Sequence, residues 1–140
     1  MPRARSTVLA LLTAALAYAG CGGAMQPDEL SRSIGTLESV AADGALLGGD
    51  VARDRTKATF ARVHARDLGE TVEHEAEKLH DASAEGRVAF RKAAAVDLAG
   101  RISEALGQIQ TAPDSEQEGR SAESALTRLG DRAGKLAEGL

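Results

Sequence analysis

The stretch from Ala95 to Ile109 reads AVDLAGRISEALGQI, and it decides the fold. Apolar side chains recur within it at steps of three and four residues: Ala95, Leu98, Ile102, Ala105 and Ile109. Because an α-helix turns once in about 3.6 residues, this spacing puts all five side chains on one face of a helix. We expect that helix to extend from Ala84 to Gln110, with Ser83 as its N-cap.

The same spacing predicts two helices before this one. The first should cover Pro27–Leu47, because Pro suits the first helical position and the glycine pair Gly48-Gly49 suits a helix end. The second should cover Val51–Asp81, which makes it the longest helix of the chain. Phe60 and Val63 fall off its apolar stripe, so either they pack on another neighbour or the helix bends or breaks before Leu68.

A fourth helix should follow the breaker Thr111-Ala112-Pro113-Asp114. Ser115 and Glu118 have the spacing of a capping box at its start. Its apolar positions again have helical spacing: Ala122, Leu126, Leu129, Ala133, Leu136 and Leu140.

No stretch alternates apolar and polar residues as a strand does. Four amphipathic helices joined by short turns predict an all-α fold, an antiparallel up-and-down four-helix bundle over residues 27–140. An even number of helices should return the C-terminus towards the start of the first helix.

The residues before the bundle have the layout of an export signal. Arg3 and Arg5 supply positive charge, and the uncharged apolar run Val8–Ala17 follows them. This run is much shorter than the roughly 20 residues that a membrane-spanning helix needs. We therefore expect a cleaved signal peptide over residues 1–20.

The end of this signal, Tyr18-Ala19-Gly20-Cys21, resembles the lipobox of bacterial lipoproteins. Ala19, Gly20 and Cys21 match the pattern, and Tyr18 stands where the family prefers Leu. The resemblance implies cleavage before Cys21, a diacylglycerol on its sulfur, and a protein anchored by lipid to the extracytoplasmic face of the cell membrane. It leaves open the inner or the outer membrane.

The lipoprotein interpretation divides the chain into a signal peptide over 1–20, a lipidated cysteine and tether over 21–26, and the bundle over 27–140. The tether Gly22–Gln26 spans at most about 17 Å when extended. An alternative is cleavage at the Ala-x-Ala site formed by Ala17 and Ala19, which would release a soluble secreted protein.

Composition excludes several classes of ligand. Removal of residues 1–20 takes away Arg3 and Arg5, so the net charge changes from −4 to −6, which argues against nucleic acid as a partner. Only Phe60 and Phe90 remain as aromatic residues, so platforms for stacked bases, sugars or planar cofactors are absent from the sequence pattern. We expect no cofactor.

Acidic residues and histidines gather in the second predicted helix. Glu77-Lys78-Leu79-His80 resembles the Glu-x-x-His element of ferritin-like di-iron bundles, but the second such element that those proteins need does not occur in this chain. Glu73, Glu77 and His80 share one edge of the helix, which leaves a weak metal site as an alternative. The main expectation is that this face of the helix is exposed to solvent and carries ion pairs between neighbouring turns.

No pattern typical of a nucleophilic enzyme, a phosphate-binding loop or a dinucleotide fold occurs in the chain. We therefore expect no enzyme. The expected partners are the membrane, through Cys21, and either another protein or a second copy of this chain, through the amphipathic helices.

Overall fold

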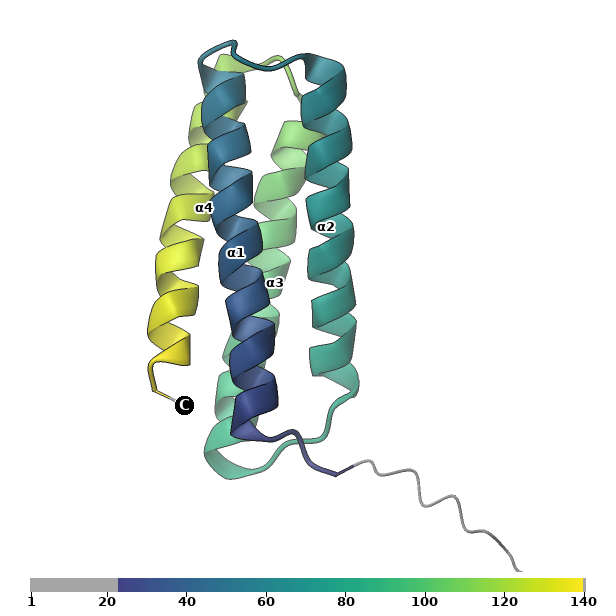
Figure 1. Ribbon diagram of the computed structural model, residues 1–140, viewed down its shortest axis with the longest axis vertical. Helices are drawn as coiled ribbons and strands as arrows, with labels where there is room; N and C mark the ends of the chain where they lie inside the picture. The colour runs from purple at the N-terminus through teal and green to yellow at the C-terminus, as the bar shows by residue number, and fades with distance from the viewer. Residues whose placement is uncertain (1–22, 140) are drawn as a thin grey trace, which may run out of the picture.

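The computed structural model describes residues 23–139 and forms four helices joined by short connections (Figure 1). They are α1 (Pro27–Ala52), α2 (Ala58–Asp81), α3 (Gly86–Thr111) and α4 (Glu116–Ala137). The helices pack antiparallel, and the described part of the chain contains no strand, so the predicted fold class is confirmed. The predicted signal peptide, Cys21 and Leu140 lie outside the described residues.

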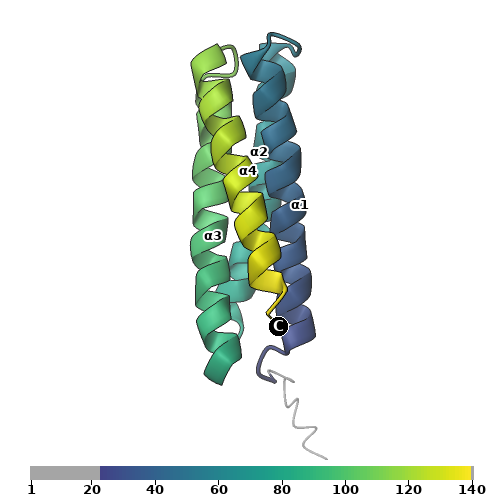
Figure 2. The same ribbon diagram turned by 90° about the vertical axis from the view of Figure 1, so that its left-hand side faces the viewer.

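Each helix has one main neighbour. α1 packs most extensively on α4, and α2 packs most extensively on α3. Figure 2 shows α4 in front, between α3 and α1, with α2 behind them. The N-terminal end of α1, the connection between α2 and α3, and the C-terminal end of the chain lie towards the same end of the bundle (Figure 1). We call this the tethered end, because the predicted tether precedes it in the chain.

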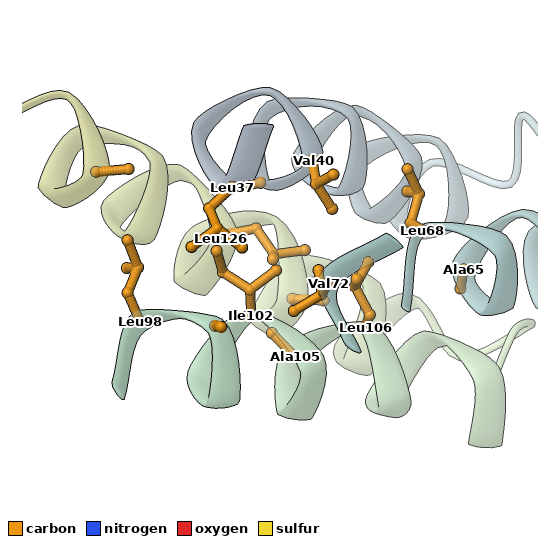
Figure 3. Close-up of a cluster of buried hydrophobic side chains, with 14 of the residues drawn as sticks. Leu37, Val40, Ala65, Leu68, Val72, Leu98, Ile102, Ala105, Leu106 and Leu126 are labelled. Carbon is orange, nitrogen blue, oxygen red and sulfur yellow. The ribbon is translucent and has the colours of Figure 1, made fainter. Parts of the chain in front are cut away.

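Aliphatic side chains from all four helices fill the centre of the bundle (Figure 3). Every member of the stripe that predicted α3 is buried. The largest fully buried side chains are Leu and Ile residues, with alanine at several positions on α2 and α3. The hydrophobic effect on these residues is the main force that holds the helices together.

Helix starts agree with the sequence signals at two of the four positions. Pro27 begins α1, and the Glu29 carboxylate accepts a hydrogen bond from the Gln26 backbone N–H at 3.1 Å. At the start of α4 the Ser115 Oγ accepts from the Glu118 N–H at 3.2 Å. Both contacts satisfy backbone groups that have no partner inside the helix.

The predicted start of α3 is wrong by two residues. The helix begins at Gly86, after Glu85, and Ser83 is not its N-cap. Gly86 has a φ of 55°, a backbone conformation that L-residues with a side chain rarely adopt. This glycine directs the chain from the α2–α3 connection into the helix.

The predicted end of the first helix is also wrong, because α1 continues through Gly48 and Gly49 to Ala52. The reason is the closeness of α4. A Cβ built on Gly48 would lie 2.8 Å from the backbone N of Glu123, and a Cβ on Gly119 would lie 2.6 Å from the backbone N of Ala52. These glycines allow two helix backbones to touch, so they do not end α1.

α2 begins at Ala58 and not at the predicted Val51, because a connection separates it from α1. Asp54, with a φ of 51°, turns the chain out of α1, and Arg55 pairs with Asp50 at 2.8 Å. α2 therefore has 24 residues against 26 in both α1 and α3, and the prediction of a longest second helix is wrong.

Phe60 and Val63 do not pack against a neighbouring helix. They are 60% and 43% exposed, and α2 is one continuous helix past them. The Phe60 ring stacks on His64 of the next turn, with ring centroids 5.5 Å apart. Neither of the two arrangements expected for this pair is found.

Candidate functional site

The tethered end of the bundle is the candidate site, because Met25, four residues after Cys21, is held in the fold there. Met25 is only 6% exposed and belongs to the hydrophobic core. Its backbone N–H donates a hydrogen bond to the carbonyl of Ser83, at 2.7 Å, in the connection between α2 and α3. Met25, within the stretch predicted as tether, is therefore part of the folded bundle.

The short segment between Cys21 and Met25 limits how far Cys21 can lie from the bundle. Only Gly22, Gly23 and Ala24 separate Cys21 from Met25. At roughly 3.4 Å per residue, Cys21 lies at most about 14 Å from Met25.

Two basic side chains connect the elements that meet at this end. Lys92 of α3 donates to the carbonyl of Ala82 at 2.8 Å, and Arg91 donates to the carbonyl of Leu136, near the end of α4, at 2.6 Å. The acceptors are carbonyls at the C-terminal ends of α2 and α4, where the helix dipole favours positive charge. These contacts bind the start of α3 to its neighbours.

The surface of the tethered end combines one large apolar side chain with many charges. Phe90, in the second turn of α3, is 78% exposed, the largest exposed fraction among the large apolar residues of the described chain. Arg87 next to it is exposed as well. Five exposed carboxylates surround this end: Asp28, Glu29, Asp81, Glu85 and Glu138.

Sequence reasoning did not single out Phe90 as a functional residue. The apolar stripe of α3, continued towards its N-terminus, passes through positions 88, 91 and 92 and leaves Phe90 outside. The sequence signal that could have identified Phe90 is its position as a lone phenylalanine outside the apolar stripe of an amphipathic helix.

The three residues of the alternative metal site are exposed side chains of α2. Glu73, Glu77 and His80 each face solvent. Among the described residues no group of three or more His, Cys, Asp or Glu side chains is arranged to hold a metal ion. Neighbouring charges form a salt bridge instead, between Lys78 and Glu75, with N and O 3.4 Å apart.

A second surface feature is a groove between α1 and α4. Its volume is about 430 Å³, and exposed Leu46 lies on one side of it. Ala42, Ala45 and the buried Leu126 line it beside Leu46, while Glu38 and Asp131 add negative charge. Arg53 contacts Glu123 at the distal end of the groove, at 3.0 Å.

None of the described helices is both long and apolar enough to cross a bilayer. Comparison with models of protein families, with curated proteins and with solved structures finds no match for this chain. The residues themselves therefore carry the functional argument.

Proposed function

We propose that this chain is an exported lipoprotein, anchored to the membrane by acyl chains on Cys21, whose helical bundle is a non-catalytic interaction module. The observation that carries the proposal is the sequence Tyr18-Ala19-Gly20-Cys21 directly behind an uncharged apolar run. Two or three acyl chains suffice for stable membrane attachment, whereas one chain is marginal.

The position of Met25 supports this proposal. A lipoprotein needs its folded domain to begin close behind the modified cysteine or to be joined to it by a linker. Here the core begins at Met25, and its hydrogen bond to Ser83 binds the segment after Cys21 to the bundle. An acylated Cys21 would therefore keep the bundle next to the membrane.

The anchor is tested by expressing the full chain in a bacterium that has the lipoprotein-processing enzymes. We expect the mature protein to start at Cys21, to carry the added mass of its acyl chains and to partition into detergent. The Cys21→Ser variant should lose both the added mass and the partitioning. Gly23→Ala is the matched control, because it leaves Ala19–Cys21 intact and its Cβ meets no atom within 4 Å.

Two results would contradict the anchor. A mature protein that starts at Gly20, with a free thiol on Cys21 and no membrane attachment, would support secretion through the Ala-x-Ala site instead. A full-length chain that keeps residues 1–20 would contradict export by either route.

The interaction role is supported by apolar side chains far from the tethered end. Leu46, near the end of α1, is 71% exposed, and Phe60 is exposed in the first turn of α2. Both lie about 30 Å from the tethered end, since a helix rises about 1.5 Å per residue. With a mature charge of −6, we expect the partner to be a protein and not a nucleic acid.

Photo-crosslinking in living cells tests this role. A photoreactive amino acid at Leu46 should give a discrete crosslinked product, either with another protein or with a second copy of this chain. The same probe at Gly100, an exposed position of α3 with no atom near its Cβ, should give none. Equal products from both positions, or none from Leu46, would contradict an interaction surface on α1.

A further inference from the structure

We propose that the tethered end of the bundle rests on the lipid surface, with the Phe90 side chain inserted at the level of the headgroups. This inference rests on the proposed lipid anchor and adds a second, apolar point of contact. Phe90 is 78% exposed, and a phenylalanine ring gains free energy when it leaves water for an apolar environment.

The direction of α3 places Phe90 towards the membrane. The helix starts at Gly86, at the tethered end, and Phe90 lies about 6 Å along it, at about 1.5 Å per residue. Side chains of an α-helix lean towards its N-terminus, so the ring leans towards the tethered end. Apolar groups of peripheral proteins enter the interface to a depth of about 5–10 Å, which covers this position.

The short tether brings this end within reach of the lipid. An acylated Cys21 would lie at the headgroup level, and Met25 lies at most about 14 Å from it. Met25 is bound to Ser83, and Lys92 binds Ala82, so the start of α3 lies beside the attachment point of the tether. The bundle cannot move far from the membrane that holds Cys21.

The charges at this end are of both signs, so the contact that we propose is apolar. Exposed cations lie at this end as well: Arg32, Lys78, Arg87 and Lys135. Arg91 and Lys92 also keep their charge, because they donate hydrogen bonds to neutral backbone carbonyls. These cations balance the five exposed carboxylates of this end, so we expect anionic lipid to change the contact little. We expect contact with vesicles of zwitterionic phosphatidylcholine.

The test uses the absence of tryptophan from the chain. The Phe90→Trp variant of the mature lipoprotein, reconstituted into phosphatidylcholine vesicles, should emit at shorter wavelength than the same protein in water. Phosphatidylcholine brominated on its acyl chains should remove at least half of this emission. Phe60→Trp is the matched control, because Phe60 is an exposed aromatic residue near the opposite end, and its emission should be unchanged by either lipid.

Failure of this inference and failure of the anchor give different results. A protein without acyl chains does not float with the vesicles, which contradicts the anchor. A protein that floats but whose Phe90→Trp emission stays at the wavelength found in water contradicts the membrane contact alone.

A second preparation tests the contact without natural lipidation. Cys21 is the only cysteine of the chain, so the mature protein can be coupled there to a maleimide phospholipid. Strong quenching of Phe90→Trp with unquenched Phe60→Trp supports the contact. Equal quenching of both variants would mean that the bundle lies flat on the membrane and would overturn the proposed orientation.

Discussion

The two main helix pairs of the bundle differ in how close their backbones come. Between α1 and α4, Gly48 and Gly119 face each other, and a Cβ on Gly119 would lie 2.8 Å from the carbonyl oxygen of Gly48. Between α2 and α3 the contact consists of side chains, mainly alanine, leucine and isoleucine. Gly69 of α2 has only the Gln110 side chain near it, at 3.6 Å from an added Cβ.

The difference shows that glycine has two distinct effects in one fold. At the α1–α4 contact its missing side chain is a steric requirement, because backbone atoms of the partner helix occupy that space. At Gly69 the missing side chain only lowers helix propensity. All three glycines lie within helices, so the neighbouring helix, and not the local sequence, separates the two cases.

The largest expected effect is that of Gly119→Ala. The added Cβ would lie 2.6 Å from the backbone N of Ala52, so α1 and α4 must separate, and we expect the free energy of unfolding to fall by about 3 kcal/mol. Urea denaturation measures this fall in the free energy of unfolding. Gly100→Ala is the control, because its Cβ meets no atom within 4 Å. A Gly119→Ala protein as stable as the wild type would contradict the close backbone contact.

A smaller loss is expected for Gly44→Ala, also on the α1 face. Its Cβ would lie 2.9 Å from Leu106 Cδ2 and 2.9 Å from Leu126 Cδ1, and these are ends of side chains that can rotate. We expect a loss of between about 1 and 2 kcal/mol, measured in the same denaturation series. A loss larger than that of Gly119→Ala would mean that the core is less adaptable than the backbone contact.

The opposite sign is expected for Gly69→Ala in the α2–α3 pair. Alanine has the higher helix propensity, and the nearest atom, Gln110 Nε2, is at an ordinary contact distance of 3.6 Å. The free energy of unfolding should rise by about 0.5–1 kcal/mol, which the urea midpoint reports. A loss of stability would show that α2 and α3 are packed as closely as α1 and α4.

The smallest effect is expected for Ser33→Ala, which concerns α1 alone. Ser33 is fully buried, and its Oγ has no hydrogen-bond partner among the described residues. Removal of an unsatisfied buried hydroxyl should raise the free energy of unfolding by about 0.5 kcal/mol. The thermal midpoint should rise accordingly, and Ser39→Ala is the control, because its exposed hydroxyl bonds the carbonyl of Gly35. A fall with Ser33→Ala alone would reveal a hydrogen bond at that hydroxyl.

The sequence by itself determined the fold class and the starts of α1 and α4. The stripe over 95–109 predicts a helix with one buried face, because helical periodicity depends only on the order of residues along the chain. Pro27 and Ser115 act within one helical turn, so their roles could also be read locally. The lipobox pattern at Cys21 is likewise a linear signal, and it still awaits its test.

Only the tertiary structure decided where α1 ends and how the tethered end is built. Gly48-Gly49 suits a helix end by its local sequence, yet α1 continues through it because α4 lies against those residues. Met25 is buried because the α2–α3 connection meets it, and Phe90 stays exposed because no helix covers that side of α3. These outcomes depend on segments distant in sequence, and the pattern of a single helix does not contain them.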